Sequence, residues 1–293
     1  MATAYTLDRD VIRIAGPDAI SYLQGQLSQD VAGLAVGASA FTFLLEPQGK
    51  VSAWGRITRI DDDAIIFDVD RGFAEVTIAR LNRFKLRTKA DIEHLDWGVV
   101  ALRGGVEGFK SVDAVLTRFD WPGFEGVDLV GTDVTVPSDI AVGNATDYER
   151  RRIEAGVPVL GHELDGDTIP AEAGALVIEQ SVSFTKGCYT GQELVARVDS
   201  RGSNTPRRLR LVRIDDGVPE AGSELLVDDK VVGRLTSVAA SDGGAVALAY
   251  VQRAVLPPVA AVVVDQAGRK YTSICVPLAG PPSAVGTGDR AAT

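Results

Sequence analysis

The stretch from Phe184 to Glu193 reads Phe-Thr-Lys-Gly-Cys-Tyr-Thr-Gly-Gln-Glu and carries the clearest pattern for chemistry in the chain. Residues 190–193 are typical of a helix start with Thr190 as the N-cap. Cys188 would then stand two residues before the helix, where backbone N–H groups stabilise a thiolate and Lys186 adds a positive charge. The alternative is a tight turn in which Cys188 is a small buried filler, because most cysteines are structural. The residues alone leave both interpretations open.

The elements around this stretch are predicted from periodicity and turn residues. Three apolar runs separated by turns predict a strand meander, and an amphipathic run predicts a helix over 72–84. A second capping pattern at 146–149 predicts a helix that stops at Gly156. Residues 84–92 alternate, so Lys85, Arg87 and Lys89 are predicted to share one face of a strand. The meander runs are Phe41–Leu45, Val51–Ile60 and Ile65–Val69.

The last third of the chain has a different texture, with short Val-rich runs broken by Gly, Pro and Asp. Such spacing predicts a small all-β module, a barrel or a sandwich, with Cys275 as interior filling. The tail from Ala279 is rich in Gly, Pro, Ser and Ala, which favours disorder. The six predicted strands are Leu209–Ile214, Leu225–Val227, Val231–Leu235, Val246–Val251, Ala260–Val264 and Tyr271–Val276.

Composition excludes several classes of protein. The chain has 293 residues, a net charge of −10, two cysteines and two histidines. Two thiols from one chain cannot frame a disulfide scaffold, a four-thiolate zinc site or a four-thiolate iron–sulfur cluster, so no permanently bound metal is expected. The acidic balance disfavours direct nucleic acid binding. Without a leader pattern or a membrane-length apolar run, we expect a cytoplasmic protein with no membrane partner.

The octapeptide Lys-Gly-Cys-Tyr-Thr-Gly-Gln-Glu at 186–193 resembles the signature of the YgfZ family of folate-binding proteins, which are relatives of the glycine cleavage T-protein, an aminomethyltransferase. Weaker resemblances extend over nearly the whole chain. The matching segments are Tyr22–Val31, Arg83–Arg87, Arg152–Pro158, Thr168–Glu172, Arg197–Gly202 and Gly233–Ser237.

The resemblance implies an α+β fold of three modules, with antiparallel sheets flanked by helices and a C-terminal β-barrel. The implied modules are 1–45 with 140–205, which binds folate, then 46–139, then the barrel at 206–278, followed by the tail at 279–293. It further implies a monomer that binds tetrahydrofolate or a derivative. Such a protein would support the assembly or repair of iron–sulfur enzymes, its protein partners, and through them tRNA modification.

By the same resemblance, Cys188 is the reactive residue and the signature supplies folate contacts. Glu154 matches a glutamate that T-proteins use against the pterin ring; the alternative is an exposed helical residue paired with Arg150 or Arg151. The basic run around Arg87 would attract the glutamate tail of folate, unless it is simply a solvated face. The residues expected to bind the cofactor are Glu154, Lys186, Tyr189, Gln192, Arg197 and Arg87.

One departure from the T-protein pattern bears on activity. Ala53 and Trp54 stand where T-proteins carry acids, which removes a carboxylate able to steer proton movement at the folate nitrogen. An accessory factor is therefore favoured over a folate-dependent aminomethyltransferase, which stays the first alternative. A module that binds tRNA directly is the second, kept open by the basic residues of the 84–92 run.

Overall fold

Two five-stranded sheets and a closed barrel make up the β structure of the residues described. The computed structural model describes residues 2–106, 109, 114–200, 202 and 204–278, so the predicted tail at 279–293 lies outside the described residues. The pairings in both sheets are antiparallel, apart from a short parallel one between β1 and β10. The first sheet has the order β10 (Ala141–Val142), β1 (Thr3–Leu7), β7 (Gly98–Arg103), β9 (Gly126–Gly131) and β8 (Val115–Phe119). The second has the order β3 (Ser39–Leu45), β4 (Val51–Asp61), β5 (Ala64–Asp70), β2 (Arg9–Ala15) and β6 (Asp91–Leu95).

The barrel confirms the prediction of a small all-β module from the Val-rich runs. Each of the six predicted strands is present, and the strands close on themselves. Cys275 is fully buried inside. In order around the barrel the strands are β11 (Arg207–Ile214), β14 (Gly244–Gln252), β13 (Lys230–Ser241), β12 (Glu224–Val227), β15 (Val259–Val264) and β16 (Lys270–Val276).

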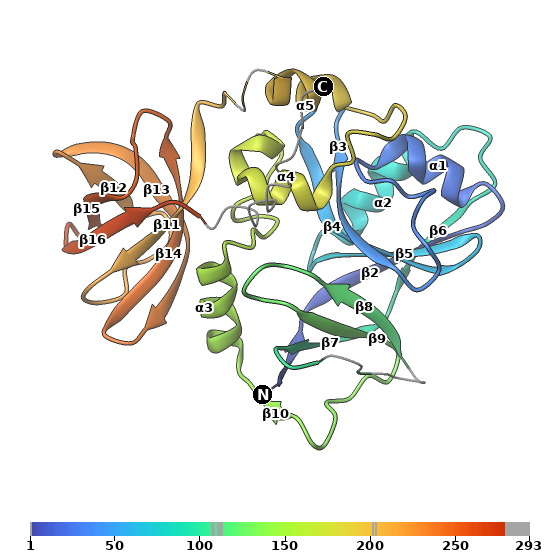
Figure 1. Cartoon of the computed structure of the whole chain (residues 1–293), viewed down its shortest axis with the longest axis horizontal. Coiled ribbons are helices and arrows are strands. Elements are labelled where there is room, and N and C mark those ends of the chain that lie inside the picture. The colour runs from blue at the N-terminus through green and yellow to red at the C-terminus, as the bar shows by residue number, and fades with distance from the viewer. Residues whose placement is uncertain (1, 107–108, 110–113, 201, 203, 279–293) are drawn as a thin grey trace, which may run out of the picture.

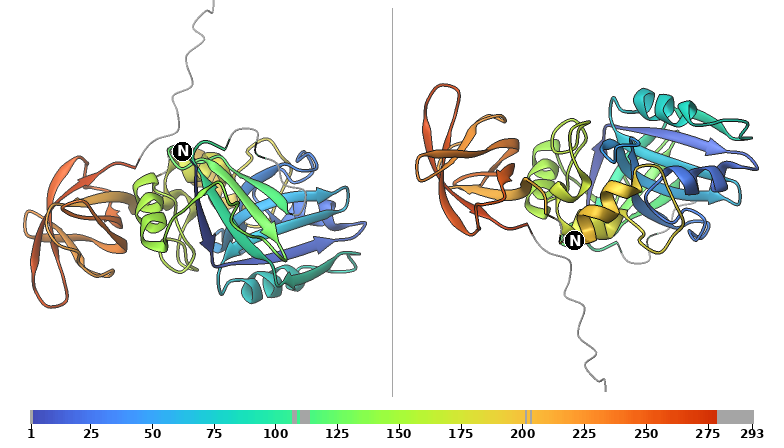
Figure 2. Two further views of the ribbon diagram at one scale, coloured as in Figure 1. Left: turned by 90° about the horizontal axis from the view of Figure 1, so that it is seen from below. Right: turned by 90° about the horizontal axis from the view of Figure 1, so that it is seen from above.

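The helices lie on the second sheet and between the sheets and the barrel. Figure 1 shows α1 and α2 beside the second sheet, and α3 and α4 between the sheets and the barrel; Figure 2 shows the barrel at one end of the molecule from two further sides. The predicted α+β fold with flanked sheets and a C-terminal barrel is thus confirmed. The helices are α1 (Ala19–Gln26), α2 (Ala74–Arg83), α3 (Ala145–Ala155), the single turn η1 (Pro170–Ala173), α4 (Ala175–Ser181) and α5 (Gln192–Ser200).

Local signals explain where α3 begins and ends. Its N-cap is Asn144, whose side chain accepts a hydrogen bond from the Asp147 N–H at 2.8 Å, so the helix begins earlier than the capping pattern at 146–149 predicts. It ends as predicted at Gly156, which has a φ of +70° that glycine adopts without steric cost.

The predicted strand over 84–92 is wrong. Residues 84–90 form a loop, and only from Asp91 does the chain join a sheet as β6. Arg87 has a φ of +56°, which no strand allows. The proposed division between the first two modules at residue 45 stays a prediction; β3 and β4, on either side of it, pair in one sheet.

Candidate functional site

The signature loop, between α4 and α5, is anchored by Lys186. The Lys186 ammonium donates to the carbonyl oxygens of Gln24 and Leu27 at 2.6 Å and to that of Gln29 at 2.9 Å. These carbonyls lie at and just beyond the C-terminal end of α1, where a positive charge is favourable. Burial lowers the pKa of Lys186 to about 8. All three donors of the ammonium are thus used to hold the loop.

Gly191 lets the loop lie directly against the turn between β3 and β4. It has a φ of +85°, and a Cβ there would meet the Glu46 carbonyl oxygen at 2.6 Å. Gly187, by contrast, faces open space. The glycine at 191 is therefore required by packing, and the one at 187 is not.

Cys188 is exposed, so the interpretation as a buried filler is wrong. Helix α5 begins at Gln192, one residue later than an N-cap at Thr190 requires. The Gln192 side-chain oxygen accepts a hydrogen bond from the Tyr189 N–H at 3.1 Å and closes the turn. Burial raises the pKa of Tyr189 to about 12, so its hydroxyl stays protonated at neutral pH. The loop thus presents a thiol to solvent on an internally bonded scaffold.

The other residues predicted to bind folate lie apart from this loop. Arg197 is exposed on α5, and Arg87 is exposed in the loop after α2. Glu154 is exposed on α3, and both of its carboxylate oxygens lie 3.1 Å from Nη1 of Arg150, as its alternative interpretation predicts. None of the six predicted folate contacts lines either of the two cavities described next. Their contact with folate stays a prediction.

A cavity of about 660 Å³ opens between the two sheets and the start of α3. Its apolar wall is aromatic. The Phe41 and Trp54 rings stack with centroids 5.0 Å apart and planes 6° apart, and Trp54 donates its indole N–H to Ser181 Oγ at 2.9 Å. Phe119 and Tyr148 extend the wall. The volume and the flat surfaces suit a planar, drug-sized ligand.

The charged groups of this larger cavity are ion pairs. Arg9 contacts Asp68 at 2.8 Å and Asp70 at 2.6 Å, and Arg56 contacts Asp128 at 2.7 Å. Arg152 pairs with Glu149, and although burial raises the pKa of Glu149, this hydrogen bond outweighs it and lowers the pKa. The cavity therefore offers ionised carboxylates as hydrogen-bond acceptors without a surplus of positive charge.

Sequence reasoning missed most of this lining. It singled out Trp54 only as a substitution for an acid. A usable signal was the charged residue inside each of two apolar strands, Arg56 in β4 and Asp68 in β5. Charged residues are seldom buried unless they are paired, so these two indicate an internal ion-pair network.

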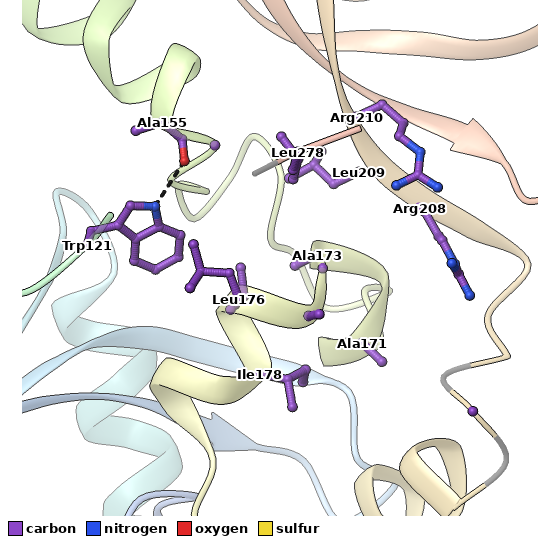
Figure 3. Close-up of a pocket in the computed structure, with 15 residues that line it drawn as sticks. Trp121, Ala155, Ala171, Ala173, Leu176, Ile178, Arg208, Leu209, Arg210 and Leu278 are labelled. Carbon is purple, nitrogen blue, oxygen red and sulfur yellow. Dashed lines mark hydrogen bonds between the residues drawn. The ribbon is translucent and has the colours of Figure 1, made fainter. Parts of the chain in front are cut away.

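A second cavity, of about 280 Å³, lies where the end of α3, η1, α4 and β11 meet. Figure 3 shows Trp121 and Leu176 on one side of it and Arg208 and Arg210 on the other. The Trp121 indole N–H donates to the Ala155 carbonyl oxygen at 3.0 Å. Among the described residues, none lines both cavities.

Two features are absent from the described part of the chain. No group of three or more His, Cys, Asp or Glu side chains in it is placed to hold a metal ion. No helix in it has the length and hydropathy needed to cross a bilayer.

Comparison with known proteins identifies the family. No family model matches the chain. It is 31% identical over 253 residues to the tRNA-modifying protein YgfZ of Klebsiella pneumoniae (strain 342), covering 76% of this chain and 75% of that protein. It is 30% identical over 241 residues to the protein of the same name from Enterobacter sp. (strain 638), covering 72% of each. Among solved structures, the glycine cleavage system aminomethyltransferase T of Bartonella henselae matches with a TM-score of 0.76 at 19% identity, over 94% of this chain and 85% of that one. The chain therefore belongs to the YgfZ family and has the fold of the glycine cleavage aminomethyltransferase.

Proposed function

We propose that this protein binds tetrahydrofolate or a derivative and acts as an accessory factor for iron–sulfur enzymes, including those that modify tRNA. The observation that carries the proposal is the larger cavity of about 660 Å³, in a chain with an aminomethyltransferase fold. A pterin ring is flat and has amino and carbonyl groups along its edge. The stacked Phe41 and Trp54 match the ring face, and the ionised carboxylates of the cavity match the amino edge.

An accessory role is favoured over aminomethyl transfer because Ala53 and Trp54, on β4, are not acidic residues. Ala53 is fully buried, and Trp54 is 2% exposed with its indole N–H bonded to Ser181. Neither side chain can take up or release a proton at a folate nitrogen. Folate bound in this cavity would then act without a carboxylate at this position.

Cys188 is the group proposed to act on the partner. Its thiol is exposed, whereas the other cysteine, Cys275, is buried in the barrel. A single thiolate cannot hold an iron–sulfur cluster, so a cluster in transit would need thiolates of the client protein as well. Direct tRNA binding is not part of the proposal, because the net charge is −10.

An anaerobic calorimetric titration with tetrahydrofolate tests the folate part. We expect the wild-type protein to bind and Trp54→Leu to bind at least tenfold more weakly, since stacking on an aromatic ring contributes about 1–3 kcal/mol. Phe184→Leu, at an aromatic ring that is 53% exposed, is the matched control and should bind like the wild type. Near-ultraviolet circular dichroism checks that each variant is folded.

Two results of this titration would contradict the proposal at different points. No binding by the wild-type protein would remove the folate function. Weakening by Glu154→Ala with no effect of Trp54→Leu would move the site away from the larger cavity and to the end of α3.

Complementation tests the role of Cys188. In a strain that lacks this protein, wild-type protein should restore the activity of iron–sulfur enzymes that modify tRNA, measured as the modified nucleoside content. Cys188→Ala should restore little of it while keeping the wild-type affinity for tetrahydrofolate. Thr185→Ala, exposed in the same loop, is the matched control. Full restoration by Cys188→Ala would contradict the role of the thiol.

A further inference from the structure

A concentration of positive charge lies where α2 is joined to β6. We call residues 83–89, from the last residue of α2 into the loop that follows, the basic loop. It holds four basic residues and no acidic one, in a chain with 40 acidic residues against 30 basic ones. β6 is an edge strand of the second sheet, so the basic loop lies at an edge of that sheet (Figure 1). Its charge is thus local and opposite in sign to that of the whole chain.

Three cations of the basic loop are exposed and unpaired. Arg83, Arg87 and Lys89 are exposed, and among the described residues no acidic side chain forms an ion pair with any of them. Arg80, one turn earlier on α2, is different, because it is buried and lies 3.4 Å from a carboxylate oxygen of Glu46. The three exposed charges stand within seven positions of the chain and are available to a partner.

The backbone of the basic loop is held in one strained shape. Arg87 has a φ of +56°, which is unfavourable for a residue with a Cβ. Asp18 accepts a hydrogen bond from the Lys89 N–H at 2.7 Å, and its own N–H donates to the Lys89 carbonyl oxygen at 3.2 Å. The Lys85 ammonium donates to the Ala90 carbonyl oxygen at 2.6 Å. Strain of this kind gathers at binding and active sites, and here it falls on an exposed cation.

An exposed leucine among these cations indicates the kind of partner. Leu86 is 83% exposed, more than any other large apolar side chain of the described residues. The sugar–phosphate backbone of an RNA would leave this side chain in water, and a long polyanion would also be repelled by the net charge of −10. A short acidic protein segment with an apolar side chain would cover Leu86 and match the charge.

We propose that the basic loop binds an acidic segment of a partner protein, in which carboxylates flank an apolar side chain. The carboxylates would meet Arg83, Arg87 and Lys89, and the apolar side chain would cover Leu86. The glutamate tail of a folate would supply carboxylates but no apolar group for Leu86. No residue of the basic loop lines the larger cavity, so this site is separate from the proposed folate site and does not depend on it.

Fluorescence anisotropy of the full chain with three fluorescein-labelled peptides tests the site. The first peptide has glutamates on both sides of a pair of leucines, the second has glutamines in place of the glutamates, and the third has serines in place of the leucines. We expect the first to bind at least tenfold more tightly than the second and at least threefold more tightly than the third. Raising the salt from about 0.05 M to about 0.5 M should remove most of the preference for the first over the second.

Three variants assign the binding to the basic loop. Arg87→Gly removes the charge and relieves the strain, so it should weaken binding of the first peptide at least threefold without lowering the midpoint of urea unfolding. Leu86→Ser should also weaken it and bring the first and third peptides to the same affinity. Arg213→Gln, at an exposed arginine of β11, is the matched control and should bind like the wild type.

Four outcomes would overturn the proposal. Absence of binding by the first peptide would show no site. Equal binding of the first and second peptides would show contact without recognition of charge. An RNA hairpin that binds more tightly than the first peptide, and more weakly to Arg87→Gly than to the wild type, would show a nucleic acid surface. Weaker binding of tetrahydrofolate by Arg87→Gly would assign the basic loop to the folate tail.

Discussion

Lys186 and Cys188 stand two residues apart in the signature loop and have opposite surroundings. The Lys186 ammonium is enclosed by three carbonyl oxygens, whereas the Cys188 thiol faces solvent. Lys186 was expected from the sequence to add charge near the thiol or to contact folate. In the structure, the ammonium binds backbone carbonyl oxygens at the end of α1. In this loop, therefore, the lysine holds the scaffold and the cysteine is the group that a partner can reach.

Substitution of Lys186 tests this division between the two residues. Lys186→Met keeps the apolar stem but leaves three backbone carbonyls without their donor, which should lower the free energy of unfolding by about 1–3 kcal/mol. Cys188→Ala, at an exposed position in the same loop, should change it by no more than about 0.5 kcal/mol. Urea denaturation followed by circular dichroism measures both. Equal midpoints for Lys186→Met and the wild type would show that the anchor is dispensable.

At the scale of elements, the sequence predicted correctly those strands and helix ends that depend on neighbouring residues in the chain. The barrel strands are short apolar runs broken by Gly, Pro and Asp, and the glycine at 156 ends α3 where its positive φ is needed. Residues 84–90 alternate in charge, but one contact from Asp18 and one within the segment hold them in a loop. Asp18 accepts a hydrogen bond from the Lys89 N–H at 2.7 Å, and Lys85 donates to the Ala90 carbonyl oxygen at 2.6 Å. Alternation of charge alone could not reveal these contacts.

The cavities could not be predicted in the same way, because their walls come from distant segments. Phe41 and Trp54 lie on adjacent strands, but Phe119 and Tyr148 belong to the other sheet and to α3. The two arginines of the smaller cavity are close in sequence, yet the apolar wall opposite them comes from α4 and the segment around Trp121. Only the packing of sheets, helices and barrel brings such residues together.

At the scale of the whole molecule, buried carboxylates join the two sheets and the barrel. Glu163, 1% exposed, accepts hydrogen bonds at 2.6 Å from the hydroxyls of Thr236 and Ser237 on β13 and contacts Arg152 of α3 at 3.3 Å. It thereby fastens the barrel to the centre of the molecule. Asp128 on β9 does the same between the two sheets. It contacts Arg103 of its own sheet at 2.5 Å and Arg56 of the other at 2.7 Å.

Measuring the free energy of unfolding as the pH is lowered tests whether Asp128 joins the two sheets. Burial raises the pKa of Asp128, but Arg103 and Arg56 outweigh it and lower the pKa from 3.8 to about 2. Between those values the unfolded chain binds the proton and the folded one does not, so the contribution of Asp128 is complete above pH 3.8 and is lost as the pH falls towards 2.

At pH 7 Asp128→Asn should lose about 3–5 kcal/mol of unfolding free energy, because two buried guanidiniums lose their shared charge. The difference in unfolding free energy between Asp128→Asn and the wild type should narrow between pH 3.8 and 2, as measured by urea denaturation at each pH. Asp120→Asn, at the exposed pair with Arg118, should show neither effect. A gap for Asp128→Asn that stays constant through this pH range would mean that Asp128 holds the sheets together by shape and not by its charge.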